Sequence, residues 1–331
     1  MNIIFHKKNI YGLIQMDDEK PKYIVLGPGG ARGFYFLGVL HQLASEGQLT
    51  EVIGYSGSSV GAMIALLLTC GYTPVQIMGM AAETAIFTDF YNVKIGEKLL
   101  EMRSNYGITS NSAIRSKIER AVIDKYSRIV SMEDLYLMTG IDLVTVTYNI
   151  DTRRPVYMSH KSHPHLDVVT AVLLSINIPL LFYRMSYGGH TYIDGGFVDP
   201  LPIAPFDNGK DRVLAIYINT QINAPADGGS FLSHITTYIH HILTTSIHRV
   251  RDMIVLTSSP KCDFIEINSS LADTTGASFS VSDKANMILH GVIAANKYLD
   301  RPPVDRSGVW MYPRQSSELI SELAAERVVK Y

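Results

Sequence analysis

Between residues 52 and 61 the chain reads Val52-Ile53-Gly54-Tyr55-Ser56-Gly57-Ser58-Ser59-Val60-Gly61. The apolar run over residues 52–55 predicts a strand, and the apolar run over residues 60–70 predicts a helix. The turn between them has the pattern Gly-x-Ser-x-Gly, in the strand–turn–helix setting that a nucleophilic serine requires. Its glycines allow a strained turn that exposes the Ser59 oxygen at a helix N-terminus, which favours negative charge. Five residues alone also fit an ordinary loop with a helix cap.

A second glycine-rich turn covers residues 27–33, Gly-Pro-Gly-Gly-Ala-Arg-Gly, between a strand predicted over 23–26 and a helix predicted over 34–44. A dinucleotide-binding turn would need a third glycine where Arg32 stands, and an acidic residue about 20 residues later that the chain lacks. As a backbone nest, Gly29 and Gly30 would instead offer N–H groups to an anion, with Arg32 adding positive charge. An oxyanion hole beside a nucleophilic serine suits acyl transfer.

A carboxylate ends a third strand-like run, in Tyr192-Ile193-Asp194-Gly195-Gly196. The two glycines allow the chain to bring Asp194 close to another backbone or side chain. A turn-forming aspartate is the common alternative, and the segment alone does not choose between them.

The strand–glycine turn–helix unit occurs twice within 50 residues, which predicts an α/β sheet with its chemistry at the carboxyl ends of the strands. A helix over residues 281–299 is expected to be capped by Ser280 or Ser282. Further strands are predicted over residues 142–148, 155–158, 191–193, 213–218 and 264–267, and further helices over 75–86, 110–126, 166–175, 231–255 and 317–330.

The composition is that of a folded chain, with 331 residues, 47% hydrophobic and 18% charged. The formal net charge of −2 argues against a polyanion-binding protein, so nucleic acid is not an expected partner. No apolar stretch of about 18 residues predicts a membrane span. The N-terminus has no signal-peptide pattern, and the two cysteines, Cys70 and Cys262, exclude a disulfide framework.

In this order, the three blocks resemble the patatin-like phospholipase family, over about residues 22–299, with further family-like stretches at residues 147–157, 171–182 and 279–291. The resemblance implies a three-layer α/β/α fold with a mostly parallel central sheet. It also implies a Ser–Asp dyad with Ser59 as nucleophile and Asp194 as base, an oxyanion hole at Gly29 and Gly30, and an anion- or substrate-binding role for Arg32. The glycines of these motifs are Gly33, Gly57, Gly61, Gly195 and Gly196.

The chain departs from the family pattern at four positions. Pro28 occupies the first glycine of the oxyanion block and has no N–H to donate. Asn177 and Arg184 replace an alanine and a proline that are usual near the substrate cleft, and Asp199 stands where the family often has asparagine. These changes leave substrate preference open.

The expected organisation is a lead-in over residues 1–21, the patatin-like domain over 22–299, and a linker with an amphipathic helix over 300–331. The tail from Ser317 and the apolar residues Phe231, Leu232 and Ile235 predict action at lipid interfaces. Packing of the tail on the body of the protein or on a second subunit is an equal alternative. A homo-oligomer and a protein activator stay open. Residence in the cytoplasm with transient attachment to membranes is expected, and delivery to another cell is compatible with the absence of a signal peptide.

The resemblance implies a lipid acyl hydrolase of the phospholipase A or lysophospholipase type, with a phospholipid or lysophospholipid substrate at a membrane surface. Two alternatives are a serine acyltransferase that uses the same Gly-x-Ser-x-Gly turn (the nucleophile elbow, residues 57–61) and a non-catalytic lipid- or protein-binding module. No cofactor is expected and no metal, since the sequence has no calcium loop or His/carboxylate site. Surface or packing roles are the default expectation for the eleven histidines. Among them, His163 and His165 are the best metal candidates, and His190 is the one whose position suits a catalytic role.

Overall fold

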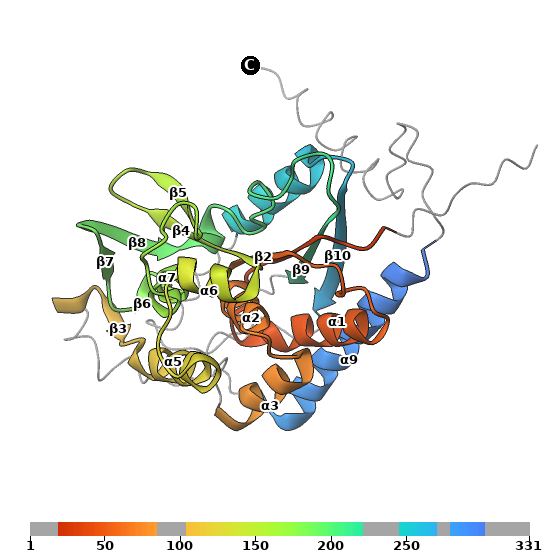
Figure 1. The fold of residues 1–331 in the computed structure, drawn as a ribbon, viewed down its shortest axis with the longest axis horizontal. Helices are drawn as coiled ribbons and strands as arrows, with labels where there is room; N and C mark the ends of the chain where they lie inside the picture. The colour runs from red at the N-terminus through yellow and green to blue at the C-terminus, as the bar shows by residue number, and fades with distance from the viewer. Residues whose placement is uncertain (1–18, 85–103, 221–244, 270–278, 302–331) are drawn as a thin grey trace, which may run out of the picture. The chain divides into compact units, whose positions relative to one another are not determined.

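The computed structural model describes residues 19–84, 104–220, 245–269 and 279–301, and among them the central sheet has eight strands (Figure 1). The strand order is β10-β9-β1-β2-β4-β8-β7, and β5 also pairs with β4. Five strands are parallel: β1 (Tyr23–Leu26), β2 (Gly54–Ser58), β4 (Asp142–Asn149), β9 (Val213–Thr220) and β10 (Cys262–Ser269). Three are antiparallel additions: β5 (Arg154–Met158), β7 (Met185–Tyr187) and β8 (His190–Asp194).

Helices cover one face of the sheet, and this face holds the larger apolar core. The other face packs against residues 201–206 and against the helical residues 245–257, which lie on the opposite side of the sheet from α1 and α2 in Figure 1. The resulting three-layer α/β/α arrangement with a mostly parallel sheet confirms the predicted fold. The labelled helices are α1 (Phe34–Ser45), α2 (Val60–Thr69), α3 (Pro74–Thr84), α5 (Ser112–Tyr126), α6 (Met132–Thr139), α7 (Val168–Ser175) and α9 (Val281–Leu299).

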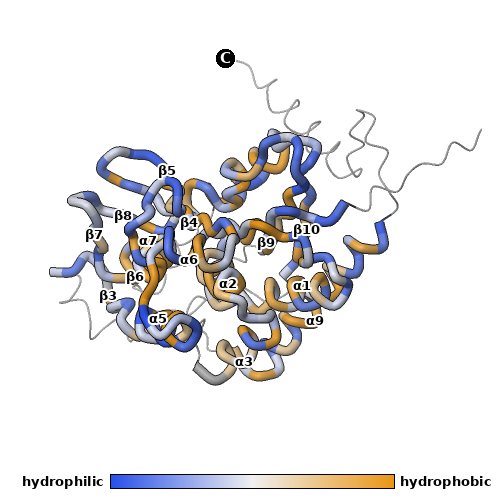
Figure 2. The backbone as a smooth tube through the Cα atoms, in the orientation of Figure 1, coloured by the Kyte–Doolittle hydropathy of each residue, from blue (hydrophilic) through white to orange (hydrophobic). Residues whose placement is uncertain are grey.

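Hydropathy along the backbone explains why the sheet is covered on both sides (Figure 2). The central strand β2 is buried along its whole length, and α2 after it is buried at every position. A strand in a parallel sheet that is covered on both faces has no solvent face, so its sequence reads as a continuous buried run rather than an alternation. Both cysteines are buried free thiols.

Most predicted elements lie where the sequence places them, with ends displaced by one to three residues. The strand predicted over 52–55 is β2, which begins at Gly54 and continues to Ser58 because it pairs with β1 and β4 on both sides. Ser280 caps α9: its Oγ accepts the Asp283 N–H, and its own N–H donates to the Asp283 carboxylate. Of the helix predicted over 231–255, residues 245–257 are helical. Residues 231–244 and the tail 317–330 lie outside the described part of the chain.

Four of the described α-helices and strands were not predicted. The helix α6 begins with a capping box of Ser131 and Asp134, which is a sequence signal that could have revealed it. The strands β3 (Gly107–Thr109), β6 (Leu180–Phe182) and β7 have three residues each, too few to show a period. No helix among the described residues has the length and apolar character needed to cross a membrane.

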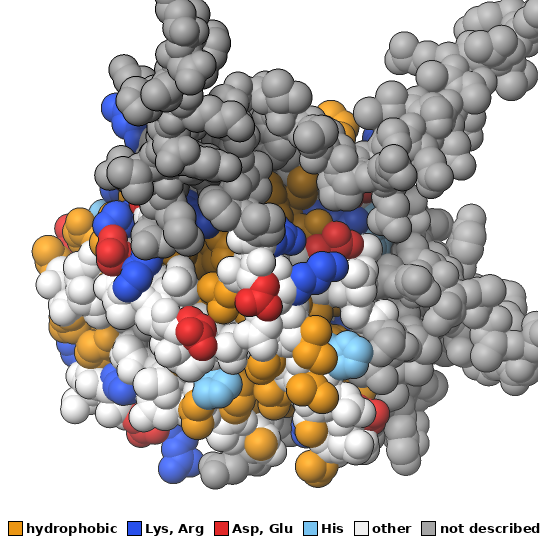
Figure 3. All heavy atoms as spheres, turned by 90° about the vertical axis from the view of Figure 1, so that its right-hand side faces the viewer, with side chains coloured by type: hydrophobic (Ala, Val, Ile, Leu, Met, Phe, Trp, Pro, Cys, Tyr) orange, Lys and Arg blue, Asp and Glu red, His pale blue; other side chains and the backbone are white. Residues whose placement is uncertain are grey.

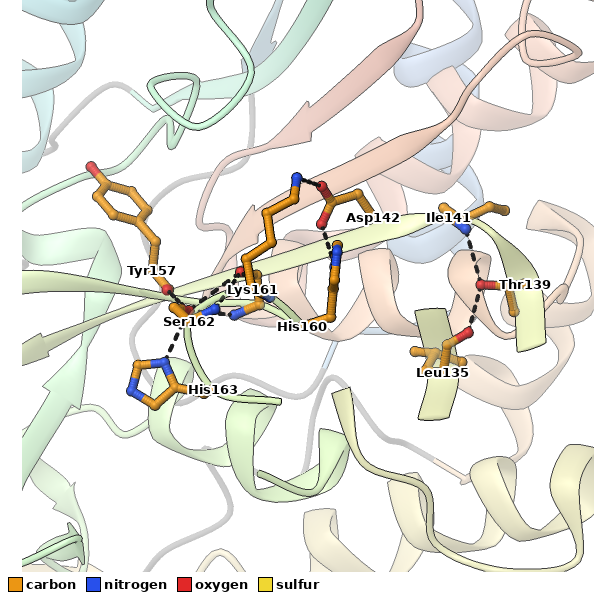
Figure 4. A network of polar contacts seen from close by, with 10 residues as sticks. Leu135, Thr139, Ile141, Asp142, Tyr157, His160, Lys161, Ser162 and His163 are labelled. Atoms are coloured by element: carbon orange, nitrogen blue, oxygen red, sulfur yellow. Dashed lines mark hydrogen bonds and ion pairs between the residues drawn. The ribbon is translucent and has the colours of Figure 1, made fainter. Parts of the chain in front are cut away.

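A polar network holds the amino end of β4, the end of the strand away from Ser59 (Figure 4). The Asp142 carboxylate lies 3.1 Å from His160 Nδ1 and 2.7 Å from Lys161 Nζ. The His160 ring stacks on Tyr136 of α6, with 3.7 Å between the ring centroids. These contacts fasten α6 and the turn after β5 to the base of β4, so this network has a structural role apart from the elbow.

Candidate active site

Ser59 occupies a strained turn between β2 and α2. Its backbone has φ 56° and ψ −128°, and Ser59 is only 5% exposed. A Cβ at Gly57 would lie 2.3 Å from the Gly61 carbonyl carbon, and a Cβ at Gly61 would lie 2.3 Å from the Leu26 oxygen. No side chain fits at either position, so strand, turn and helix approach this closely only with both glycines present. This is the elbow geometry that the sequence predicts for a nucleophilic serine.

The sheet topology brings Asp194 to the same edge as Ser59. Asp194 ends β8, and its partner on β4 is Thr147, one residue beyond Val146, which pairs with Ser58. Asp194 is 3% exposed, and its carboxyl group lies close enough to the Ser59 side chain for the serine to lower its pKa. Its Oδ1 also accepts the Gly196 N–H at 2.7 Å. The structure thus brings the two members of the predicted dyad together, and their catalytic roles stay a prediction.

Burial raises the pKa of Asp194 to about 7, while the hydrogen bonds from Ser59 and Gly196 act in the opposite direction. Desolvation penalises the charged carboxylate, which has almost no contact with water here. A carboxyl group with a pKa near 7 is a far better proton acceptor for a hydroxyl than an exposed aspartate. An exposed aspartate is too weak a base to take a proton from a hydroxyl. The buried environment of Asp194 thus makes it chemically feasible for an aspartate to act as base without a histidine.

The C-terminal end of α7 holds both residues of the pair. The Ser59 N–H donates to the buried Ser175 Oγ at 3.2 Å, and the Asp194 N–H donates to the Asn177 carbonyl at 2.9 Å. The Asn177 side-chain amide also donates to the Tyr192 carbonyl at 2.9 Å. The sequence marked Asn177 only as a departure from the family and gave Ser175 no role. The one signal that could have indicated these two residues is that polar side chains stand at the end of an otherwise apolar helix.

Ser175→Ala is expected to slow the labelling of Ser59 by a serine-directed phosphonate about tenfold, since it leaves the buried Ser59 N–H without an acceptor. Ser175→Thr keeps the hydroxyl and should restore most of the rate. The matched control is Ser45→Ala, which removes an exposed hydroxyl that bonds only its own helix. Equal labelling rates for Ser175→Ala and Ser45→Ala would contradict this role.

The glycine-rich turn after β1 lies between the elbow and the Asp194 turn. A Cβ at Gly29 would lie 3.4 Å from Val60 Cγ1, and a Cβ at Gly196 would lie 3.0 Å from the Pro28 ring. Gly30 has φ +52°, in the left-handed region that favours glycine. Arg32 is half-buried in the short 3-10 helix Gly30–Gly33. The structure brings this turn to the dyad, and the oxyanion and anion-binding roles of its residues stay predictions.

Asp199 braces the Asp194 turn from the other side. Its Oδ2 accepts the Tyr157 hydroxyl of β5 at 2.5 Å, and its N–H donates to the Gly195 carbonyl at 2.9 Å. Burial raises the pKa of this carboxyl as well. The residue that departs from the family's asparagine thus ties the glycine turn to the sheet.

His190 does not join the site. It begins β8 while Asp194 ends it, and four residues of strand span about 13 Å. Its side chain is 48% exposed and lies 3.9 Å from Asp151. His163 bonds its neighbour Ser162. Within the described ranges, no group of three or more His, Cys, Asp or Glu side chains could hold a metal ion, so His163 and His165 do not form such a group there.

The sequence is similar to a known protein family and to several characterised or named proteins. The family model of patatin-like phospholipases matches residues 24–207. "Probable lipid hydrolase 463L" of invertebrate iridescent virus 6 is 27% identical over 209 residues, which are 61% of this chain and 70% of the viral protein. The lysophospholipase NTE1 of the yeast Meyerozyma guilliermondii is 23% identical over 232 residues, 69% of this chain but 15% of the yeast protein.

Among solved structures, VipD from Legionella pneumophila has a TM-score of 0.52 and 16% identity, over 85% of this chain and 67% of VipD. At this identity the likeness concerns the fold alone. The family match ends at residue 207, so the extension of the domain to residue 299 stays a prediction.

Proposed function

The chain belongs to the patatin-like phospholipase family, and we propose that it hydrolyses fatty acyl esters of glycerophospholipids or lysophospholipids through Ser59 and Asp194. The observation that carries this proposal is the buried pair itself, in which Asp194, a carboxyl group whose pKa burial raises to about 7, lies beside a serine on a strained elbow. The relatives named as lipid hydrolase and lysophospholipase support the substrate class.

In the first half of the reaction, Ser59 Oγ attacks the ester carbonyl and its proton passes to Asp194. The carbonyl oxygen becomes an oxyanion, which the N–H groups of Gly29 and Gly30 would stabilise. Asp194 then gives the proton to the leaving alcohol as the carbon–oxygen bond breaks. The lysolipid or glycerol derivative departs and the acyl group stays on Ser59.

In the second half, Asp194 takes a proton from water, and the resulting hydroxide attacks the acyl-enzyme. Collapse of the second tetrahedral intermediate releases the fatty acid and returns the proton to Ser59. Each half needs Asp194 first as base and then as acid, so a pKa near neutral pH serves both. No step requires a metal ion or a cofactor.

The test is the release of free fatty acid from vesicles that contain both phosphatidylcholine and lysophosphatidylcholine, in excess chelator. We expect release by the wild-type chain and none by Ser59→Ala, with a sharp rise in rate once lipid forms micelles or vesicles. Transfer of the acyl group to an added alcohol without fatty acid release would favour the acyltransferase alternative. Lipid binding without either product would favour a non-catalytic module. Activity that needed added calcium or zinc would contradict the metal-free mechanism.

The proposed location follows from the substrate. A lipid acyl hydrolase must reach the surface of a membrane, and we propose a protein of the cytoplasm that attaches to membranes transiently. Fractionation of cells that express the tagged chain tests this, with partial recovery in the membrane fraction as the expected result.

A further inference from the structure

Two hairpin turns meet beyond the carboxyl end of β4, at the edge of the sheet that carries Ser59. Asn149, the last residue of β4, pairs with Arg154 of β5 on one side and with Tyr192 of β8 on the other. The β4–β5 turn follows Asn149, and the β7–β8 turn consists of Gly188 and Gly189. Because Ser58 pairs with Val146, Ile150 lies about 10 Å further along the strand direction than Ser59. Figure 1 shows both turns at the same end of the molecule.

Backbone and side-chain bonds hold the two turns together. Asn149 Oδ1 accepts the N–H groups of Asp151 and Thr152, both at 3.0 Å. Asp151 Oδ2 then accepts the Thr191 N–H of β8 at 2.6 Å, and the Ile150 N–H donates to the Thr191 carbonyl at 3.1 Å. The carboxylate of Asp151 is therefore engaged in the brace. These bonds join the β4–β5 turn to the start of β8, which follows the β7–β8 turn. We call residues 150–154 and 184–190 together the double turn.

The double turn presents apolar and cationic side chains to solvent. Ile150 is 42% exposed and Tyr187 is 36% exposed. Arg153, Arg154 and Arg184 are exposed as well. In the described part of the chain, none of these three guanidinium groups forms an ion pair with a carboxylate. Arg184 instead stacks on the exposed ring of Tyr106, with 4.4 Å from Cζ to the ring centroid.

We propose that the double turn docks the protein on an anionic phospholipid surface. The proposal rests on the proposed function, since a lipid hydrolase needs a membrane at the edge of the sheet where Ser59 lies. Arginine near an anionic bilayer gains from its surface potential, and tyrosine favours the boundary between headgroups and acyl chains. An exposed isoleucine beside unpaired arginines suits a bilayer better than a nucleic acid or an acidic protein, because only the bilayer offers an apolar phase beneath its negative charge.

A second exposed apolar patch provides an internal comparison. On α9, Val281, Leu289 and Ile293 are exposed, and Figure 3, which looks at the side of the molecule where α9 lies, shows hydrophobic side chains gathered on the lower part of that face. Unlike the double turn, α9 itself contains no arginine. Replacing the apolar residues of this patch therefore shows how much vesicle binding changes when exposed apolar side chains are removed elsewhere on the surface, for comparison with the same change at the double turn.

Vesicle binding tests the charges without any turnover, if the vesicles are made of ether-linked lipids. We expect the wild-type chain to co-sediment with vesicles of ether-linked phosphatidylcholine that contain about one third phosphatidylglycerol, and to do so less well at high salt. The double variant Arg153→Glu/Arg154→Glu should reduce this binding by at least about 20-fold. The matched control is Lys210→Glu/Lys297→Glu, which makes the same charge change at exposed positions near the opposite edge of the sheet, and should stay within about threefold.

Two further measurements keep the outcome clear. Hydrolysis of a soluble short-chain ester should be unchanged in both charge variants, so a failed docking site and a failed hydrolase give different results. Ile150→Ser/Tyr187→Ser should also lose binding, whereas Leu289→Ser/Ile293→Ser should not. If the Glu variants fold poorly by circular dichroism, Arg153→Gln/Arg154→Gln replaces them with a smaller expected loss. No binding by the wild-type chain, or equal losses in test and control variants, would overturn the proposal.

Discussion

Asp194→Asn is expected to slow the acylation of Ser59 by about 10³-fold or more, nearly as much as Ser59→Ala. The reason is that, in the proposed dyad, Asp194 lies beside Ser59 and takes its proton without a histidine as relay. Asparagine keeps the shape and the acceptor for the Gly196 N–H but cannot take a proton. In a Ser–His–Asp triad the acid only orients the base, and the histidine would be the residue whose loss abolishes labelling. Phosphonate labelling of Ser59 and fatty acid release both measure the effect.

The controls are single replacements of histidines. His190→Ala and His41→Ala should leave labelling within about tenfold of the wild-type rate, because one lies at the far end of β8 and the other is exposed on α1. Single replacements of the histidines at 6, 234, 240 and 241, which lie outside the described residues, extend this set of controls. A folded histidine variant as inactive as Ser59→Ala, beside an active Asp194→Asn, would show that the dyad is wrong.

The same base should be visible in the pH profile. With the pKa of Asp194 at about 7, its proton-accepting form predominates only above that pH. We expect kcat/KM to fall about tenfold per pH unit below 7 and to level off above it. An ordinary aspartate would keep full activity down to about pH 4 to 5. A profile flat between pH 5 and 8, in a chain that stays folded, would mean that burial does not tune this carboxyl.

The elbow could be predicted from the sequence because its signal is local. Gly57, Ser59 and Gly61 show the elbow in five residues, and the steric reason for both glycines is visible in the distances to neighbouring backbone. The cap of α9 is equally local, since Ser280 and Asp283 lie within one turn of each other. Asp194 needed more, because its link to Ser59 depends on the pairing of β8 with β4.

What the sequence could not show is how distant segments meet. Ser175 and Ser59 are 116 residues apart, and no pattern in either segment tells that one binds the amide of the other. His190 illustrates the converse, because it lies only four positions before Asp194 in the chain but an extended strand keeps the two side chains apart. The double turn also depends on register, since Asn149 must pair with two strands at once.

Asp194→Asn should also make the protein more stable at pH 8, by about 2–4 kcal/mol in the free energy of unfolding. In the unfolded chain an aspartate loses its proton near pH 3.9, whereas in the folded chain Asp194 keeps it up to about pH 7. Between these values the folded state binds one proton more than the unfolded state, so stability falls as the pH rises. Above pH 7 the whole penalty of a buried charge is present, and below about pH 4 it is absent.

Urea denaturation of the wild-type chain and of Asp194→Asn at pH 8 and pH 5 measures this, with Asp124→Asn on the exposed side of α5 as a control that should change little. The gain should be largest at pH 8 and shrink toward pH 5, because protonation relieves the wild-type chain of the buried charge. A gain that did not depend on pH, or a loss at pH 8, would contradict the raised pKa. The two expectations for Asp194→Asn support each other, since a variant that is more stable than the wild-type chain cannot owe its lost activity to unfolding.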